Sequence, residues 1–261
     1  MTDTPRALVR PPSPHLADGL LTHLERVPVD VVLARRQWDG YVAALTGAGW
    51  DAVEVPAVPE CPDGVFVEDT VVMVGGTAVI THPGAEPRRP ETLGTSVTVR
   101  ALGYPTATIE DGHLEGGDVL KIGTTVYVGR TARTDAAGVA ALRRICAPLG
   151  HRVVAVPTTR VLHLKSAVTA LPDGTVIGYP PLVDDPAFWP HFRPMPEEGG
   201  SHVVDLGDGR LLMAASAPRS AALIADLGFT PVPVDISEFE KLEGCVTCLS
   251  VRLRHAPSTA V

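Results

Sequence analysis

The chain has no long apolar run, no excess of basic residues and few cysteines. No stretch approaches the ~18 consecutive apolar residues that mark a membrane-spanning helix, and residues 1–6 lack the apolar core of a secretion signal. The formal net charge of -8 gives no reason to expect a basic face for nucleic acid. We therefore expect a cytoplasmic protein that binds neither membranes nor nucleic acid.

The few cysteines also limit the classes of protein. They are too sparse for a disulfide scaffold. Cys245 and Cys248 form a C-x-x-C pair, but a structural zinc site needs two further ligands and no second pair is present. A redox dithiol stays open as an alternative. No glycine-rich phosphate loop precedes a helix, so nucleotide binding has little support.

What the sequence does contain is a series of β-hairpin signals. Each consists of two apolar runs around a turn, often with glycine or Asp-Gly at its tip. Between the hairpins, segments with helical spacing of apolar residues lead into short strands. The predicted hairpins span 69–80, 118–128, 167–177 and 202–213, the helices 31–48, 133–150 and 217–228, and the short strands 52–56, 152–157 and 231–235.

The spacing of these elements predicts a repeat. The first three hairpin turns lie roughly 50 residues apart, which is the scale of a supersecondary unit. A unit of helix, strand, loop and hairpin indicates an α/β fold that is not a purely parallel sheet. Because no Pro-rich or Gly-rich stretch is a convincing linker, residues 1–261 are predicted to form a single domain.

Chemically useful side chains recur at one point of this repeat: Glu68 with Asp69, Glu115, His163 and Cys248. If the units surround an axis, these residues meet in one pocket. A thiol, a histidine and carboxylates suit nucleophilic attack on a cationic carbon, so we expect an enzyme. Taken singly, each residue also has an ordinary explanation, such as a small buried cysteine or a solvated loop acid.

Polar and apolar residues alternate around the histidine and the cysteine. The alternation predicts a last strand over 248–253, with Cys248, Ser250 and Arg252 on one face. The same reasoning places His163 and Lys165 together on the polar face of 161–165. The Gly-Gly pair that follows Glu115 is predicted to be a tight turn into a hairpin, with room around the carboxylate.

An ordered set of motifs resembles those of the dimethylarginine dimethylaminohydrolase (dimethylargininase) family, from about Ala7 to Arg254. In chain order they are Cys61-Pro-Asp-Gly-Val-Phe-Val-Glu-Asp-Thr, Thr81-His-Pro-Gly-Ala-Glu-Pro-Arg-Arg, Leu114-Glu-Gly-Gly-Asp-Val-Leu, Arg133-Thr, Leu162-His-Leu-Lys-Ser and Thr247-Cys-Leu-Ser. That family belongs to the guanidino-group-modifying (pentein) superfamily. The resemblance implies a five-bladed α/β propeller of ββαβ-type units, with the active site in its central channel.

The resemblance also implies the catalytic roles. Cys248 would attack the guanidinium carbon of an N-omega-methylated arginine and form a covalent thiouronium intermediate. His163 would protonate the departing methylamine or dimethylamine and then activate water, and Glu115 would support the protonated His163. The other product would be L-citrulline.

Further residues are implied to bind this substrate. Glu68 and Asp69 would lie near the guanidinium group and Asp63 near the α-amino group. Arg88 and Arg133 would hold the α-carboxylate, and Leu242 would lie on the approach to the nucleophile. No cofactor or metal is implied. The expected partner is a small molecule, with a homodimer as one option for the assembly.

Three features depart from the family pattern. The family's substrate lid corresponds to the loop from Arg10 to His15, where Pro12 replaces a contributing leucine. The sequence Leu242-Glu-Gly replaces Val-Asp-Gly before the nucleophile. Cys245 has no role in the family scheme.

Other functions stay open at this point. In arginine and agmatine deiminases an aspartate stands two residues after the histidine, where this chain has Lys165. A methylated nitrogen forms fewer hydrogen bonds than a bare amine, so the missing acid favours methylarginine. An amidinotransferase is related but needs a second amine acceptor. A non-catalytic α/β binding protein and a C-x-x-C redox protein are the alternatives of a different class.

Overall fold

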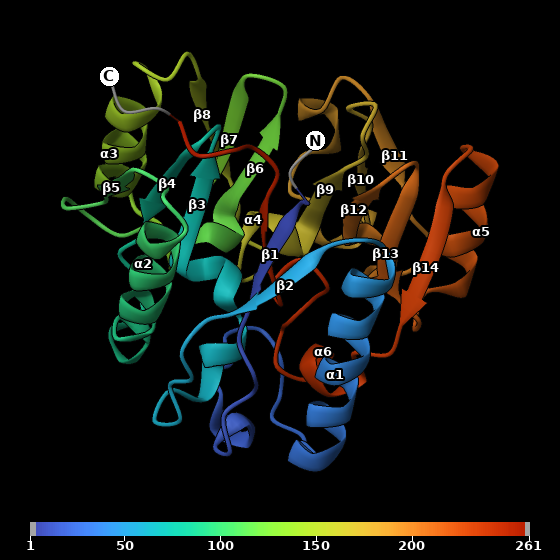
Figure 1. The fold of residues 1–261 in the computed structure, drawn as a ribbon. Helices are drawn as coiled ribbons and strands as arrows, with labels where there is room; N and C mark the ends of the chain where they lie inside the picture. The colour runs from blue at the N-terminus through green and yellow to red at the C-terminus, as the bar shows by residue number, and fades with distance from the viewer. Residues whose placement is uncertain (1–3, 259–261) are drawn as a thin grey trace.

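The computed structural model describes residues 4–258, which form five three-stranded β-sheets with helices on their outer side (Figure 1). The strands are β1 (Arg6–Val9), β2 (Asp51–Glu54), β3 (Val71–Val74), β4 (Thr77–Ile80), β5 (Thr106–Thr108), β6 (Val119–Ile122), β7 (Thr125–Arg130), β8 (Arg152–Pro157), β9 (Val168–Ala170), β10 (Val176–Gly178), β11 (Phe192–Pro194), β12 (Val203–Gly207), β13 (Arg210–Ala214), β14 (Thr230–Val234) and β15 (Val251–Leu253). The α-helices are α1 (Val31–Gly47), α2 (Glu91–Ala101), α3 (Ala136–Cys146), α4 (Leu164–Ala167), α5 (Pro218–Asp226) and α6 (Ser237–Glu240).

All five sheets have the same internal order. Two antiparallel strands are followed by a third that runs parallel to the second, as in β3-β4-β5 and β6-β7-β8. A parallel neighbour requires a crossover, and α1, α2, α3 and α5 supply it in four of the sheets. Two short 3₁₀ turns, at Pro180–Leu182 and Pro186–Phe188, replace the helix before β11. The repeat expected from the hairpin spacing is therefore confirmed.

The fifth sheet is assembled from the two ends of the chain. Strand β15 pairs antiparallel with β1, with Ala7 opposite Arg252, and β1 pairs in parallel with β2. The first strand of every sheet contributes to one cavity of about 710 Å³, which is lined by Met73, Lys121, Thr169, Asp205 and Arg252 among others. The five sheets thus surround a common centre, as the α/β-propeller expectation requires.

The local signals of the predicted elements are visible in the structure. Helices α1 and α3 are capped by the preceding residues Asp30 and Asp135, whose side chains accept the N–H groups of Leu33 and Gly138. Helix α2 was not predicted. Its apolar residues Leu93 and Val97 are exposed, so the sequence lacks the one-sided pattern of a packed helix.

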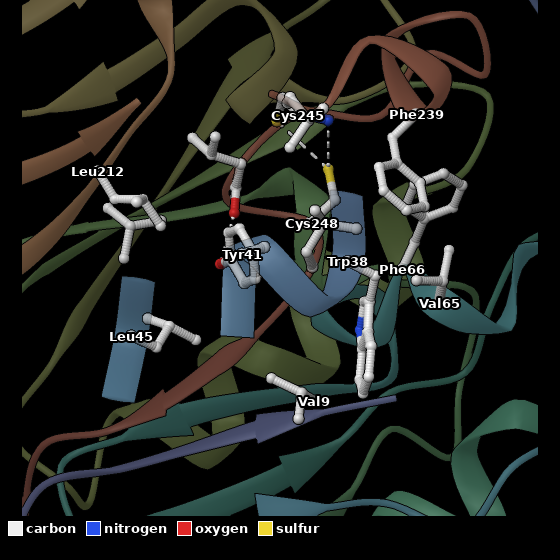
Figure 2. Packing of buried hydrophobic residues seen from close by; sticks show 14 of the residues in the cluster. Val9, Trp38, Tyr41, Leu45, Val65, Phe66, Leu212, Phe239, Cys245 and Cys248 are labelled. Carbon is white, nitrogen blue, oxygen red and sulfur yellow. Dashed lines mark hydrogen bonds between the residues drawn. The ribbon is translucent and has the colours of Figure 1, made fainter. Parts of the chain in front are cut away.

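The buried side chains form separate clusters. One contains α1 residues, the segment 65–66, α6 and the cysteines near the chain's end (Figure 2). In residues 4–258 no helix is both long and apolar enough to cross a membrane. The assignment of residues 1–261 to a single domain stays a prediction.

Candidate active site

Cys248 lies in a turn, so the strand prediction for 248–253 is wrong at its start. Strand β15 begins at Val251, and the Cys248 N–H donates to the Cys245 carbonyl at 3.1 Å. The Tyr41 hydroxyl donates to the Val246 carbonyl at 2.8 Å, which holds this turn from the side of α1 (Figure 2). Alternating polarity cannot distinguish such a turn from a strand, because tertiary hydrogen bonds determine its shape.

His163 is also not in a strand. It has extended backbone immediately before α4, and its imidazole is 3% exposed. The buried carboxylate of Asp118 accepts the Leu164 N–H at 2.9 Å and the Thr131 hydroxyl at 2.8 Å, which positions the start of α4. Lys165, expected on the same face as His163, instead pairs with Glu68 at 2.6 Å. The sequence therefore located the histidine but misjudged its neighbour.

Glu115 is fully buried and bonds directly to the histidine. Its Oε2 lies 2.7 Å from His163 Nε2, and its Oε1 lies 3.5 Å from Arg133 Nη1. Gly117, in the same short segment, makes this approach possible, because a Cβ there would lie 2.6 Å from His163 Nδ1. Its N–H donates to Asp69 Oδ1 at 2.8 Å. The space that the two glycines were expected to leave beside the Glu115 carboxylate is occupied by the His163 imidazole.

The surrounding charges favour a protonated histidine. Burial opposes protonation of His163, but the Asp69 carboxylate, the hydrogen bond to Glu115 and the charge of Asp118 outweigh it and raise its pKa to about 9. Burial likewise opposes ionisation of Asp69, yet His163 and Arg88 lower its pKa to about 2. At neutral pH the site therefore holds an imidazolium among ionised acids.

One small cavity brings together seven of the nine residues proposed from the sequence: Asp63, Asp69, Arg88, Arg133, His163, Leu242 and Cys248. Glu115 lies behind His163, outside the lining. The open volume is about 10 Å³, which is roughly the space of one water molecule. The open part of the cavity is therefore smaller than a substrate the size of an amino acid.

Glu68 is the residue that the structure places elsewhere. Its N–H donates to the Cys248 carbonyl at 3.2 Å, but its carboxylate lines the larger central cavity. There it pairs with Lys165 at 2.6 Å and with Arg252 at 2.9 Å. Two cations therefore hold the Glu68 side chain in the larger cavity, and its expected position beside a substrate guanidinium stays a prediction.

The two arginines differ in how many of their donors are engaged. Arg88 donates to Asp69 at 2.7 Å and to Glu91 at 2.9 Å, and two backbone carbonyls accept further bonds. Burial disfavours its charge, but Glu91 and Asp69 more than compensate, so its pKa is raised. Arg133 has one side-chain contact, to Glu115 at 3.5 Å. Among the cavity residues, Arg133 therefore has more donor capacity for an incoming carboxylate.

The Arg10–His15 loop, which corresponds to the family's substrate lid, contributes no residue to the lining of the small cavity. Arg10 is fully buried and donates to the carbonyls of Pro56, Gly64 and Glu91, so the Arg10–His15 loop is anchored at its start. Leu20 lines the cavity instead. The following backbone is held by Glu243, which accepts the N–H groups of Thr22, His23 and Leu24.

Sequence reasoning had no signal for Leu20 and only a weak one for Glu243. Glu243 was noted as a departure from the family pattern, without a role. The structure gives it a left-handed backbone conformation, with φ of 60°, and places it next to Leu242 in the cavity wall. Such a conformation is uncommon for a residue with a side chain, so it marks a position to test for function.

Three potential metal-ligating side chains lie close together. Ligand atoms of Asp69, Glu115 and His163 lie within 4.8 Å of one another. The imidazole already bonds to Glu115, and Asp69 is paired with Arg88. These internal contacts satisfy the group without a metal, and the expectation of a cofactor-independent site stays a prediction.

Known proteins resemble this chain over nearly its whole length. The family described as arginine deiminase matches residues 51–206. N(G),N(G)-dimethylarginine dimethylaminohydrolase of Streptomyces coelicolor is 64% identical over 250 residues, which cover 95% of this chain and 97% of that protein. The protein of the same name from Pseudomonas aeruginosa is 34% identical over 252 residues, with 94% and 98% covered.

Solved structures of dimethylarginine dimethylaminohydrolases are also similar to this chain over nearly its whole length. A dimethylarginine dimethylaminohydrolase captured as an adduct with S-methyl-L-thiocitrulline has a TM-score of 0.89 and 33% identity, covering 96% of this chain and 100% of that one. A Cys-to-Ser variant of the Pseudomonas aeruginosa protein, complexed with citrulline, also has a TM-score of 0.89 and 33% identity, with 96% and 99% covered.

Five α/β blades, with a cysteine, a histidine and carboxylates converging beside their centre, define a protein of the guanidino-group-modifying superfamily. The match to the arginine deiminase family agrees with that class. Within it, the chain belongs to the dimethylarginine dimethylaminohydrolase family, because its identity to curated members is high over almost the entire length.

Proposed function

We propose that this protein hydrolyses N-omega-methylated arginines, such as asymmetric dimethylarginine and monomethylarginine, to L-citrulline and dimethylamine or methylamine. The observation that carries the proposal is the cavity in which the Cys248 thiol and a protonated His163 face the same space, with Glu115 bonded to the far side of the imidazole. A nucleophile, an acid and a supporting carboxylate are the groups that displacement of an amine from a guanidinium requires.

Cys248 is the nucleophile in this proposal. In the free protein its hydrogen bond with Cys245, together with burial and nearby acids, raises the pKa of its thiol. A bound guanidinium opposes these effects, because a positive charge beside the sulfur stabilises the thiolate. Nucleophile activation is thereby coupled to the arrival of a cationic substrate, and Cys248 then forms a bond to the guanidinium carbon.

His163 serves as acid and then as base. Since Nε2 is engaged with Glu115, Nδ1 carries the proton that the departing amine accepts. Loss of the amine leaves the thiouronium. The neutral imidazole next takes a proton from water, which adds to the same carbon. Cleavage of the carbon–sulfur bond releases citrulline and returns the cysteine.

The cavity walls suit the rest of an amino acid. Asp69 supplies negative charge beside the guanidinium, while Asp63, fixed by the Leu20 N–H at 3.1 and 3.2 Å, suits the α-amino group. Arg133, with donors to spare, binds the α-carboxylate, and Arg88 holds Asp69 in place. Leu242 forms part of the apolar wall.

The second candidate function is hydrolysis of unmethylated arginine, which the arginine deiminase match favours. Against it, the residue two positions after His163 is Lys165, and its ammonium is held by Glu68 in the central cavity. No additional acid at that position is available to pair with a bare terminal amine. A methylated nitrogen tolerates this loss better.

The test is to incubate the purified protein separately with asymmetric dimethylarginine, monomethylarginine and arginine, and to measure citrulline. We expect turnover of both methylated substrates, and none in Cys248→Ser or His163→Ala variants that retain the native circular dichroism spectrum. Turnover of arginine alone would favour the second candidate. Citrulline formation by Cys248→Ser would exclude the thiol mechanism. A cytoplasmic location and a homodimer stay predictions from the sequence.

A further inference from the structure

Cys245 is a second thiol placed directly against the nucleophile. The two sulfurs are 3.3 Å apart, and the Cys245 N–H points to Cys248 Sγ at 3.5 Å (Figure 2). Both residues belong to one tight turn, closed by the Cys248 N–H bond to the Cys245 carbonyl. The Thr247 hydroxyl, 3.2 Å from Cys245 Sγ, further fixes the position of that sulfur.

The two thiols differ in access. Cys248 lines the small cavity, whereas Cys245 is buried behind it and is not part of the cavity wall. The hydrogen bond between the sulfurs stabilises a thiolate on one partner and a thiol on the other. It lowers the pKa of Cys245 to about 5 and raises that of Cys248. A thiolate and a thiol that share one proton in a hydrogen bond are typical of a reactive C-x-x-C pair.

We infer that Cys245 is a resolving thiol, and that a two-electron oxidant such as hydrogen peroxide converts Cys245 and Cys248 into a reversible disulfide. The disulfide protects Cys248 from irreversible oxidation while it blocks turnover. The loss of turnover rests on the proposed function, whereas formation of the disulfide does not.

The chemistry balances without another reactant. The shared proton first moves from Cys248 to Cys245 across the 3.3 Å contact. The Cys248 thiolate attacks one oxygen of the peroxide, the O–O bond breaks, and hydroxide leaves, giving a sulfenic acid on Cys248. The Cys245 thiolate then attacks Cys248 Sγ, the S–S bond forms, the S–O bond breaks, and a second hydroxide leaves. The first hydroxide takes the remaining proton from Cys245, and the second takes from solvent the proton that the pair had released on ionising. Overall, two thiols and one peroxide give one disulfide and two waters.

The turn needs little rearrangement for this reaction. A disulfide bond is about 2.05 Å long, so the sulfurs must approach each other by about 1.2 Å. The other cysteines do not share this arrangement: the Cys61 sulfur contacts the Pro87 carbonyl, and Cys146 packs in a different hydrophobic cluster.

The experiment compares the wild type with Cys245→Ala, Cys245→Ser and the control Cys61→Ser. Each reduced protein is treated with hydrogen peroxide, quenched with catalase, and divided into samples with and without dithiothreitol. Citrulline formation, intact mass and a non-reducing peptide map are recorded. Activity before oxidation is the reference for each variant.

We expect the wild type and Cys61→Ser to lose turnover completely, to lose the mass of two hydrogen atoms in a 245–248 disulfide, and to recover fully with dithiothreitol. The Cys245 variants should also lose turnover, but gain oxygen atoms on Cys248 and fail to recover. If neither Cys245 variant folds, the mass and recovery of the wild type decide the question.

The inference is overturned if the wild type gains oxygen on Cys248 without forming the disulfide, if it resists peroxide, or if the Cys245 variants recover as it does. If the protein releases no citrulline from any substrate, the proposed function fails. The mass and peptide map still report whether the disulfide forms, so the two failures are distinguishable.

Discussion

Replacing Glu115 with glutamine should move the alkaline limit of activity to lower pH. The substitution retains a side-chain oxygen for the His163 Nε2–H but removes the carboxylate charge from a bond of 2.7 Å. Glu115 acts on His163 by both its hydrogen bond and its charge, alongside Asp69 and Asp118. An opposite charge at this distance shifts a pKa by roughly 1–3.

The magnitude follows from the remaining acids. The pKa of His163 is raised from 6.5 to about 9, and loss of one of the three acids should lower it by about 1, which corresponds to about 1.4 kcal/mol. At pH 8 the wild-type imidazole is mostly protonated, whereas in Glu115→Gln about half is neutral. Since the proposed acid is the imidazolium, kcat/KM should decline over a correspondingly lower pH range.

The assay is kcat/KM for asymmetric dimethylarginine against pH, with the imidazole titrated independently by NMR. Glu110→Gln is the control, because Glu110 is exposed and the same change there should leave the profile unmoved. An unaltered alkaline limb in Glu115→Gln, with the protein folded, would refute the assignment of Glu115 as the supporting charge.

The same pKa predicts how stability depends on pH. A histidine whose pKa is higher in the folded state binds its proton more tightly there. Its contribution to stability is complete below about 6.5 and is lost as the pH rises towards 9. The unfolding free energy of the wild type should fall over that interval in urea titrations, and His163→Gln should flatten the decline.

Three further substitutions test the site and its frame. Gly117→Ala places a Cβ within 2.6 Å of the His163 imidazole, so it should lower the free energy of unfolding in urea by about 1–3 kcal/mol and abolish turnover. The control Gly40→Ala lies on an open helix surface and should change neither quantity. Equal effects of the two substitutions would contradict the steric argument. Glu243→Gln weakens three N–H contacts, so faster amide exchange at residues 22–24 and a higher KM are expected relative to the exposed control Glu25→Gln. Unchanged exchange would show that Glu243 does not hold this backbone. Arg10→Met leaves three backbone carbonyls without their hydrogen-bond donor, so it should lower the unfolding free energy by more than about 3 kcal/mol. A much smaller loss would mean that Arg10 does not anchor the loop.

Local patterns were sufficient for much of the fold. The hairpins with glycine turns at β3-β4, β6-β7 and β12-β13 were predicted because strand alternation and turn geometry depend on neighbouring residues. Helix α2 lacked such a pattern, since its exposed Leu93 and Val97 conceal which face is packed. The pairing of β1 with β15 joins the two ends of the chain and has no local signal.

The residues of the candidate site also fall into those that the sequence predicted and those that only the structure revealed. The residue types and the order of Glu115, His163 and Cys248 were readable because chemistry of this kind requires those side chains, whatever their surroundings. That these three residues meet in one pocket could be predicted only on the assumption that the repeated units surround an axis. Leu20 was missed because an apolar residue in a loop has no distinguishing feature until the cavity beside it is known.

The sequence by itself determined the repeated α/β unit and the set of reactive groups, since both follow from short-range spacing and from side-chain chemistry. The tertiary structure decided how those groups are used. Adjacent Glu68 and Asp69 enter different cavities because distant cations, Lys165 and Arg252 for one and Arg88 for the other, hold their carboxylates. The charge on His163 depends likewise on acids from two separate segments, Asp69 in one and Glu115 with Asp118 in the other, because electrostatic interaction follows distance in space and not position along the chain.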